Sequence, residues 1–554
     1  MTELRAALLT ACGCVLLVLW PLWLAPGAAM PGHPTVDVWT HAWGLGWVAD
    51  SLVAGSLPTH TALLGFPRGG SVTPADPLGG VLVAPVTLLF GVAWAMLAEV
   101  ALQVGLAALG GWFYGRTLAG AAGGALVGVA CATSPTFTAE VHNGILEAGW
   151  IGLVPLAAAL AARGSRWTPG AVALAALASP YLGVSAAVLA SLHLAASRDW
   201  RRLGLVLVLG GLAIAAATFL LRAGLGGAEP LEIKPPGIQE PTLRINAVDP
   251  RSFFWPGEHW SVPLDGSMTP AFRRTPYLGW ALLIAAGVGV WRGGRRWLVL
   301  PVFGGSIAAL GAYLWWGDGW FAPGGQGRLA LPMLVVLRLT DGGLDHPLRF
   351  LAMAIPALAA LAAIGAGRWA PLLAGVVLIE NLAVAPNVWP LASVPAAIPV
   401  VYARIPDDGR AIIDLPSQVA ETQRTGAYLY WQTAHGHPLP YTLKPNARVP
   451  DMNPALRTWL AIAAPMPTPK GTPGWIDPAA DLQAAVAALA AEGYGWVVLH
   501  REQCRDETAF VQHSEAVRAL LGAGEDAGGD LLWELPQLTT PSAPPSSPGA
   551  ADPR

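Results

Sequence analysis

The chain has 554 residues, of which 54% are hydrophobic and only 12% are charged, and its mean hydropathy is +0.49. These values exclude an ordinary soluble protein, because about 25% of the residues of an average globular domain are charged. The formal net charge is −3, and no long run of Lys or Arg occurs. Nucleic acid is therefore not an expected partner, since binding to its phosphates requires a basic surface. Four cysteines are too few for a disulfide framework.

The distribution of charge divides the chain near residue 400. Charged residues occupy about 10% of positions 1–400 and about 18% of positions 401–554. Residues 1–390 are therefore predicted to form a mainly α-helical domain in the membrane, and 400–536 a small soluble α/β domain. The last segment, 537–554, is rich in Pro, Ser and Ala and is predicted to be disordered.

Apolar runs predict the membrane-spanning helices. The first, at 6–29, is longer than the apolar part of a signal peptide and lacks a convincing cleavage site, so we interpret it as a retained span. Residues 168–196 are predicted to break at Ser179-Pro180-Tyr181, because proline removes a backbone donor. The other runs lie near 94–115, 118–133, 148–163, 203–222, 276–291, 297–315, 348–367 and 369–387.

Arginines predict the sidedness. If the N-terminus is cytoplasmic and 168–196 crosses twice, one set of alternate loops falls on the cytoplasmic side, as cationic loops usually do. These loops carry Arg116, Arg163 and Arg166, the arginines of 198–202 and 292–296, and Arg368. This gives a polytopic bundle of about eleven crossings in a bacterial cytoplasmic membrane, with the C-terminal domain outside the cytoplasm. Residues 77–93 are apolar enough to span, but a crossing there would place the following arginines outside. They are therefore predicted to form a re-entrant or interfacial helix.

The first exterior loop carries an acidic residue ahead of a Trp-rich segment. Trp39, Trp43 and Trp47 recur at helical spacing, so 38–55 is predicted to be an amphipathic helix in the lipid headgroup layer. Asp37 precedes this helix. It is placed to take a proton from a substrate hydroxyl or to hold a metal ion, and it is equally placed to be a plain N-cap.

A second exterior loop, 134–150, adds further polar groups where a span begins. Asn143 and Glu147 would share one face of a helix, and Glu140 precedes them. His142 is a candidate metal ligand or general acid/base, and an ordinary loop histidine is the alternative.

Two further candidates face the same side. Tyr181, at the helix break, is expected to line a polar cavity. Arg349 stands at the exterior mouth of a span, where a guanidinium is suited to clamp a phosphate or to reach the lipid headgroups. Glu99 and Glu380 are the acids closest to the interior of spans, which makes them functional candidates, with a role at the membrane surface as the alternative for Glu380.

The C-terminal part alternates strands and helices. The pattern predicts strands at 410–416, 495–501 and 531–536 and a helix at 481–494. The segment 428–438 concentrates Tyr, Trp and His and is interpreted as a sugar-stacking or polar binding surface, with His435 and His437 on one face of a strand.

Several segments resemble the polytopic bacterial membrane proteins related to the C-type (GT-C) glycosyltransferases, which include glycosyltransferase 39 and mannosyltransferase-like families. The resemblance rests on the segments VDVWTHAWGLGWV, GFPRGGSVTPADPLGG, VHNGILEAGWIGLVPL, ASPYLG, HPLRF and DLP followed by YLYWQTAHGHPLPY.

This resemblance implies a function. The donor would be a polyprenyl-phosphate-linked sugar, Asp37 the catalytic base or a metal-associated carboxylate, and Arg349 a phosphate contact. Members of the class often carry paired acids in the first loop, whereas here Asp37 stands alone, with Asp50 and Asp76 farther along.

The leading hypothesis is a glycosyltransferase that uses a lipid-borne donor in the membrane and a glycan, lipid or protein acceptor. Asp37, His142 and Glu147 are the predicted catalytic residues, and a divalent metal ion is left open. The alternative is a non-catalytic scaffold or an envelope protein that binds lipid-linked glycan. Convergence of the candidates on one site would favour the enzyme. The predicted substrate contacts are His41, Asn143, Tyr181 and Arg349.

Overall fold

A computed structural model describes most of the chain, and its contacts divide it into two units. The helical unit comprises Met1–His60, Ser71–Ala228 and Ile233–Ala397, and the C-terminal unit comprises Thr61–Gly70, Glu229–Glu232 and Ile398–Arg554. The described residues are 2–34, 37–72, 76–224, 237–256, 275–293, 295–317, 319–325, 327–384, 389–416, 426–443, 455, 456, 459 and 482–536.

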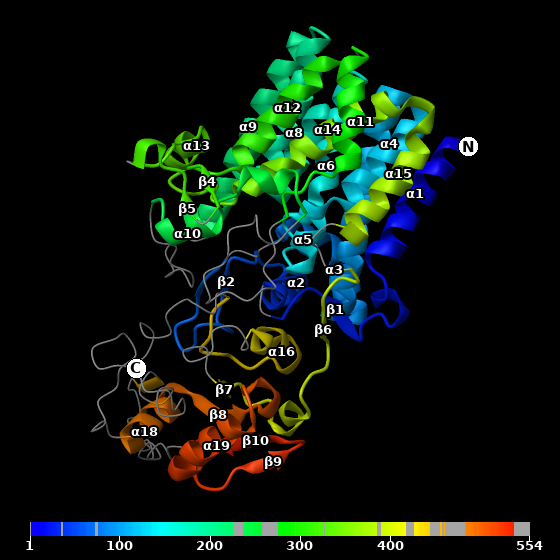
Figure 1. Ribbon diagram of the computed structural model, residues 1–554. Helices are drawn as coiled ribbons and strands as arrows, with labels where there is room; N and C mark the ends of the chain where they lie inside the picture. The colour runs from blue at the N-terminus through cyan, green and yellow to red at the C-terminus, as the bar shows by residue number, and fades with distance from the viewer. Residues whose placement is uncertain are drawn as a thin grey trace, which may run out of the picture. The chain divides into compact units, whose positions relative to one another are not determined.

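The helical unit is built from helices that lie along the predicted apolar runs (Figure 1). The first run, 6–29, is an exception, because α1 ends at Val18 and a 3-10 turn (Leu22–Leu24) and a strand from Ala29 follow. The 168–196 run breaks at Ser179, as predicted. The helix α4 contains non-helical residues at Ala119 and Gly120, which divide it into two arms at the position expected between 94–115 and 118–133. The helices are α1 (Thr2–Val18), α2 (Val38–Val53), α3 (Pro77–Phe90), α4 (Val92–Thr133), α5 (Pro135–His142), α6 (Leu153–Ala162), α7 (Thr168–Ala178), α8 (Pro180–Ala196), α9 (Trp200–Gly224), α10 (Glu240–Ile245), α11 (Trp280–Trp291), α12 (Val299–Ala309), α13 (Met333–Leu339), α14 (Leu351–Ala366) and α15 (Ala370–Ile379).

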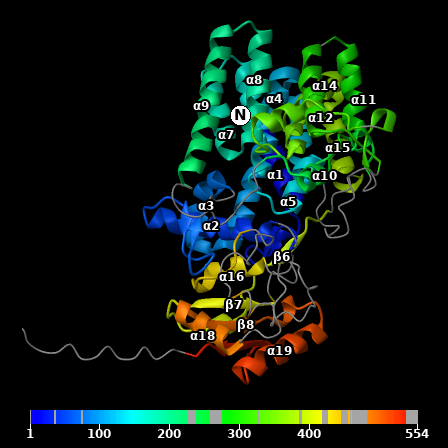
Figure 2. The ribbon, with the colours of Figure 1, turned by 90° about the vertical axis from the view of Figure 1, so that its left-hand side faces the viewer.

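The long helix α4 is the centre of the helical unit. It packs against α1, α6, α14 and α15, while α11 and α12 pack on α14. Figure 2 shows α7, α8 and α9 on one side of α4 and α11, α12, α14 and α15 on the other. Small residues permit this close packing: nearly all of the Ala-rich α14 is buried, and Gly115 lies against the backbone of Gly123 across the α4 hairpin.

Two helical stretches of the described chain, Val92–His142 and Pro347–Ala383, are long and apolar enough to cross a membrane. Six other apolar helices have 10–17 residues. Eleven crossings therefore remain a prediction. The strand β1 (Ala29–Pro31) pairs antiparallel with β6 (Ser393–Pro395), so the segments that follow α1 and α15 lie at the same end of the unit. In a membrane this pairing requires an odd number of crossings, as in the predicted eleven.

The helix α2 forms where the Trp-rich pattern predicted it, but its surroundings differ from the prediction. Trp39, Trp43 and Trp47 are at most 8% exposed, and most other residues of α2 are buried as well. The helix packs against α3 and α4. The prediction of a half-exposed helix in the headgroup layer is therefore wrong, because apolar residues surround the helix on most sides and are covered by protein.

The C-terminal unit is a four-stranded sheet with helices. Its strands run in the order β7 (Ala411–Leu415), β8 (Tyr494–Leu499), β10 (Asp530–Glu534) and β9 (Glu525–Ala527), and only β7 and β8 are parallel. Three strands and the helix α18 (Leu482–Glu492) confirm the predicted α/β pattern. The helix α19 (Glu507–Leu521) was not predicted, although the sequence contains two signals for it. Asp506 caps its first turn, and its buried residues recur at helical spacing: Phe510, His513, Ser514 and Val517. The predicted tail, 537–554, lies outside the described residues.

One prediction for the C-terminal unit is wrong. Residues Ala427–His435 form the helix α16 rather than a strand, so His435 and His437 do not share a strand face. Tyr428, Tyr430 and Trp431 are at most 7% exposed and belong to the core of the unit. They therefore do not form an exposed surface for stacking sugars.

Candidate functional site

The start of α2 presents the acidic residue of the first loop. Asp37 is exposed, and its side chain makes no capping hydrogen bond to the helix. Its backbone carbonyl accepts a hydrogen bond from the amide of His41 at 3.1 Å. The carboxylate of Asp37 is thus not used as a conventional side-chain cap, while His41, one turn later, is buried and 4% exposed.

Three of the predicted residues are joined by direct contacts. The carboxylate of Glu147 lies 3.2 Å from His41 Nε2 and 2.9 Å from Arg349 Nη2. These residues come from α2, from the loop after α5 and from the short helix before α14. Glu147 therefore connects the start of α2 to the short helix that precedes α14.

Further contacts of Arg349 extend the site. Its Nε lies 3.4 Å from Glu140 on α5, and its guanidinium lies 5.4 Å from the ring centroid of Tyr181. The hydroxyl of Tyr181 accepts a hydrogen bond from the amide of His346 at 2.9 Å and donates to Asp345 at 3.4 Å. The break before α8 thus places Tyr181 beside Arg349.

The loop after α5 is not the continuous helix that the sequence suggested. The helix α5 ends at His142, Asn143 caps it, and Gly144 adopts a φ of +73°. A Cβ at Gly144 would lie 2.7 Å from Val38, so a glycine is needed where the loop turns against α2. Asn143 and Glu147 therefore share no helix face. The rings of His142 and His33 lie 5.7 Å apart.

A cluster of buried polar side chains supports this loop. The sequence analysis did not predict that these side chains contact one another. Gln103 Nε2 donates to Glu99 at 3.0 Å and to the carbonyl of Leu146 at 2.9 Å. Asp76 accepts hydrogen bonds from Gly79 N at 2.7 Å and from Trp150 Nε1 at 2.6 Å. Leu146 directly precedes Glu147, so this cluster fixes the backbone that presents Glu147.

Asp76 is therefore closer to the site than its sequence position suggested. Its negative charge acts on His41, as do the charges of Asp37 and Glu147. The sequence signal was an acid directly before a proline that begins an apolar helix, which is an N-cap pattern.

The sequence also singled out Glu99 as a functional candidate, because acids are rare inside spans. In the structure this residue is fully buried beside Asp76. The other flagged acid, Glu380, accepts hydrogen bonds from Trp280 N at 2.7 Å and Ala281 N at 3.0 Å at the start of α11.

The pKa values show how these charges are balanced. Burial opposes protonation of His41, but the hydrogen bond and the charge of Glu147 outweigh it and raise the His41 pKa. Burial likewise disfavours ionisation of Glu147, but Arg349 and His41 outweigh it and lower the Glu147 pKa. Glu147 is therefore an ionised carboxylate between the guanidinium of Arg349 and the imidazole of His41.

The donor set does not favour a metal centre. Within the described ranges, no group of three or more His, Cys, Asp or Glu side chains is arranged to hold a metal ion. The carboxylate of Glu147 is paired with Arg349 and His41. The residues of this site therefore do not fit the metal ion that the sequence left open.

Comparisons with known proteins were made in sequence and in structure. No protein-family model and no curated protein sequence matches the chain. Among solved structures, the arabinofuranosyltransferase AftD from Mycobacteria matches with a TM-score of 0.57 and 16% identity over 96% of this chain. This chain spans 40% of the length of AftD.

Two other solved structures match less closely. The Archaeoglobus fulgidus oligosaccharyltransferase has a TM-score of 0.44 and 12% identity over 90% of this chain and 69% of its own. ArnT from Cupriavidus metallidurans bound to undecaprenyl phosphate has a TM-score of 0.37 and 13% identity over 98% of both chains. These two scores do not establish a common fold. The chain is thus similar in fold, at low sequence identity, to the membrane arabinofuranosyltransferase AftD.

Proposed function

We propose that this chain is an integral membrane glycosyltransferase. It transfers a sugar from a polyprenyl-phosphate donor to a glycan, lipid or protein acceptor of the cell envelope. The fold similarity to the arabinofuranosyltransferase supports the class, and the sequence resemblance to GT-C enzymes is the ground for the lipid-linked donor.

The observation that carries the proposal is the convergence of distant exterior segments on one charged site. Glu147 contacts both His41 and Arg349, and Asp37 lies one helical turn before His41. A scaffold with no chemistry would not require an exposed carboxylate one helical turn from a buried ionic cluster. The feature expected to separate an enzyme from a scaffold was convergence of Asp37, His142, Glu147 and Arg349 on one cavity, and of these four the direct contact joins Glu147 and Arg349.

In the proposed mechanism Asp37 is the general base. It is exposed, and its carboxylate makes no capping bond, so it is able to take the proton of an acceptor hydroxyl as that oxygen attacks the sugar. Arg349 faces Glu140 and Glu147 through Nε and Nη2, and its Nη1 is the proposed donor to a phosphate oxygen. Both groups would act by positioning and electrostatics.

Glu147 has a different role in this proposal. Its lowered pKa keeps it ionised at neutral pH, so it is poorly suited to donate a proton. It instead orients His41 and Arg349. We assign no proton transfer to His142, whose ring lies beside that of His33.

The proposed location is the cytoplasmic membrane of a bacterium, with the site facing outward. Exposed Trp167 and Trp369 lie under Arg166 and Arg368, at 5.4 and 5.2 Å, at helix ends that the arginine pattern assigns to the cytoplasm. Tryptophan and arginine at helix ends are typical of a membrane interface.

The test is sugar transfer in membranes that contain the full chain. A panel of radiolabelled polyprenyl-phosphate sugars is incubated with these membranes, and label in glycan, lipid and protein fractions is counted. Asp37→Asn is expected to lower transfer by about 10²- to 10⁴-fold, the usual loss on removing a general base. Equal protein levels in the membranes are verified by immunoblot.

Asp50→Asn is the matched control. Asp50 lies on the same helix and is also exposed, but it stands at the opposite end of α2. This variant is expected to keep its activity. Full activity of Asp37→Asn would exclude the mechanism, and no transfer by the native chain with any donor would favour the scaffold.

A further inference from the structure

The C-terminal unit contains a second cluster of titratable side chains. Asp414 lies on β7, and His500 directly follows the parallel neighbour β8. The amide of His500 donates to the carbonyl of Leu415 at 2.9 Å, which aligns the carboxyl ends of the two strands. Ligands of α/β sheets commonly bind beyond this edge.

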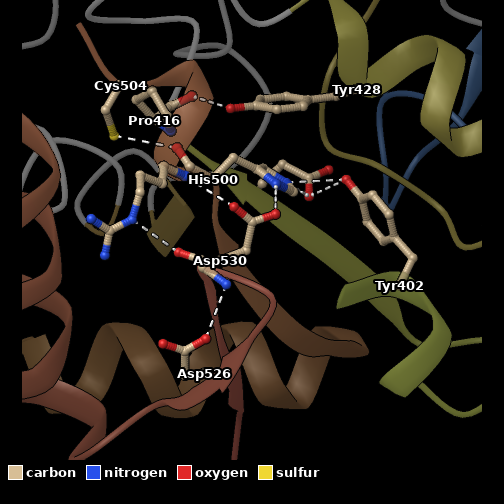
Figure 3. A network of polar contacts seen from close by, with 10 residues as sticks. Tyr402, Pro416, Tyr428, His500, Cys504, Asp526 and Asp530 are labelled. Carbon is tan, nitrogen blue, oxygen red and sulfur yellow. Dashed lines mark hydrogen bonds and ion pairs between the residues drawn. The ribbon is translucent and has the colours of Figure 1, made fainter. Parts of the chain in front are cut away.

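The centre of this cluster is a histidine between two carboxylates. His500 Nε2 lies 3.1 Å from Asp414 Oδ1, and its Nδ1 lies 2.9 Å from Asp530 Oδ2. Tyr402 donates its hydroxyl to Asp414 Oδ1 at 2.9 Å. Figure 3 shows Tyr402, His500 and Asp530 in this network. Burial opposes protonation of His500, but the hydrogen bonds and charges of the two carboxylates outweigh it and raise the His500 pKa.

Two buried polar atoms next to Tyr402 are not used by this network. Asp414 Oδ2 and His435 Nε2 have no hydrogen-bond partner among the described residues. Asp414 is fully buried, and the ring of His435 stacks on Tyr402 at 4.4 Å. A buried polar atom without a hydrogen-bond partner costs free energy of folding. We therefore expect a group from outside the chain to form hydrogen bonds with these two atoms.

The protonation state of His435 determines whether its Nε2 donates or accepts a hydrogen bond. Its Nδ1 accepts a hydrogen bond from the amide of His437 at 3.1 Å, so in the neutral ring the proton resides on Nε2. Burial lowers the His435 pKa to about 4, so the ring is neutral at physiological pH. The site therefore combines one donor, His435 Nε2, with one carboxyl oxygen as acceptor, Asp414 Oδ2.

This pair selects the chemistry of the ligand. An anion would be repelled by Asp414, and an ammonium group would meet the donor of His435. A hydroxyl group satisfies both, because it donates and accepts. Water would too, but these two groups give it fewer than the roughly three hydrogen bonds that buried waters typically make.

We propose that Asp414 Oδ2 and His435 Nε2 bind a hydroxyl group of a carbohydrate, with the ring of Tyr402 as the adjoining apolar wall. The residues Ala434 and Gly436 beside His435 are exposed, so the end of α16 that carries His435 lies at the surface. The site lies in the C-terminal unit and does not depend on the proposed transfer reaction.

The first test uses the native full-length protein in detergent micelles. Diethyl pyrocarbonate modifies neutral imidazole nitrogens, and mass spectrometry quantifies the modification of each histidine. Methyl α-D-mannopyranoside and methyl α-D-arabinofuranoside are the probes, and tetrahydropyran is the control solute without hydroxyl groups. We expect either glycoside, but not tetrahydropyran, to slow modification of His435. The rate at His513 on α19 is the internal reference.

The second test uses variants and saturation-transfer NMR of the glycosides. His435→Phe keeps a ring on Tyr402 but removes the donor, and is expected to weaken binding about five- to tenfold, as for one lost hydrogen bond. His435→Gln supplies an N–H donor and is expected to retain part of the binding. His513→Phe makes the same change on α19 and is expected to leave binding unaltered.

The outcomes separate the site from its alternatives. Protection of His435 together with weaker binding in His435→Phe supports the proposal. Equal binding by His435→Phe and the native chain overturns it. Absence of protection and of NMR signal with both glycosides also overturns it and leaves an ordered water only. None of these readouts involves sugar transfer, so the result is independent of the proposed enzyme activity.

Discussion

The carboxylate of Glu147 lies 2.9 Å from the guanidinium of Arg349, although the two residues belong to segments of the helical unit that are far apart in the sequence. Both side chains are largely covered, with 22% and 10% exposed. Neither charge is fully solvated there, so each depends on the other. This ion pair is the link between the loop after α5 and the beginning of α14.

Loss of this link should destabilise the helical unit. Glu147→Ala leaves Arg349 with the longer contact to Glu140 and the ring of Tyr181, and removal of one partner of a buried pair costs roughly 3 kcal/mol or more. Thermal unfolding in detergent micelles measures the effect. The double variant Glu147→Ala/Arg349→Met should lose less than the sum of the single variants.

An exposed ion pair provides the control for this prediction. Arg328 and Glu240 lie 2.6 Å apart with 38% and 51% of their side chains exposed. Glu240→Ala should therefore change stability by no more than about 1 kcal/mol. A similar loss in both variants would mean that Glu147 is not a buried partner.

The close approach of Asp76 and Glu99 depends on Gly79. A Cβ at position 79 would collide with the carboxyl group of Glu99 and would lie 2.8 Å from Asp76 Oδ2. Gly79→Ala should thus destabilise the chain by about 1–3 kcal/mol through overpacking. Gly170→Ala on α7, where no atom lies within 4 Å, should stabilise it by about 0.5–1 kcal/mol. Unfolding curves that rank the two variants in the opposite order would contradict the packing around Gly79.

The stability of the C-terminal unit should decrease as the pH rises above neutral. The folded unit raises the His500 pKa above the unfolded value of about 6.5, so the folded state keeps a proton that the unfolded state releases. The stabilisation is complete below the unfolded pKa and is lost as the pH passes the raised folded pKa. The groups facing His500 are Asp414 from β7, Asp530 from β10, Tyr402, and Tyr428 and Trp431 from α16.

Hydrogen exchange of β7 and β8 at several pH values measures this effect after correction for the intrinsic exchange rate. His500→Gln should remove the dependence above neutral pH. On the acid side, His435 acts in the opposite direction: its folded pKa of about 4 lies below the unfolded value, so stability falls as the pH drops below about 6.5. A native profile that stays flat from neutral to alkaline pH would argue against a cationic His500.

The predicted orientation of the chain in the membrane is tested by chemical labelling of single cysteines. In a chain whose native cysteines are replaced, His60→Cys should react with a membrane-impermeant maleimide in intact cells, because the exposed His60 lies in the first exterior loop. Arg166→Cys, also exposed, should react only after permeabilisation. The reverse pattern would place Asp37 on the cytoplasmic side and would exclude an outward-facing site.

Local sequence patterns predicted most of the elements. Apolar runs, the Pro180 break and the alternation after residue 400 depend on interactions between near neighbours, and the helices and strands follow them closely. The buried position of α2 and the helical state of α16 did not follow from local pattern. Periodicity indicates which side chains are apolar, but packing decides what covers them.

The sequence by itself determined that an acid, a histidine and an arginine stand near the ends of apolar helices: Asp37, His41 and Arg349. Only the tertiary structure decided that Glu147 joins His41 to Arg349 and that Asp76 and Glu99 meet behind the loop. The physical reason is that ion pairs and buried hydrogen bonds form between groups brought together by helix packing. Their sequence separation carries no information about that distance.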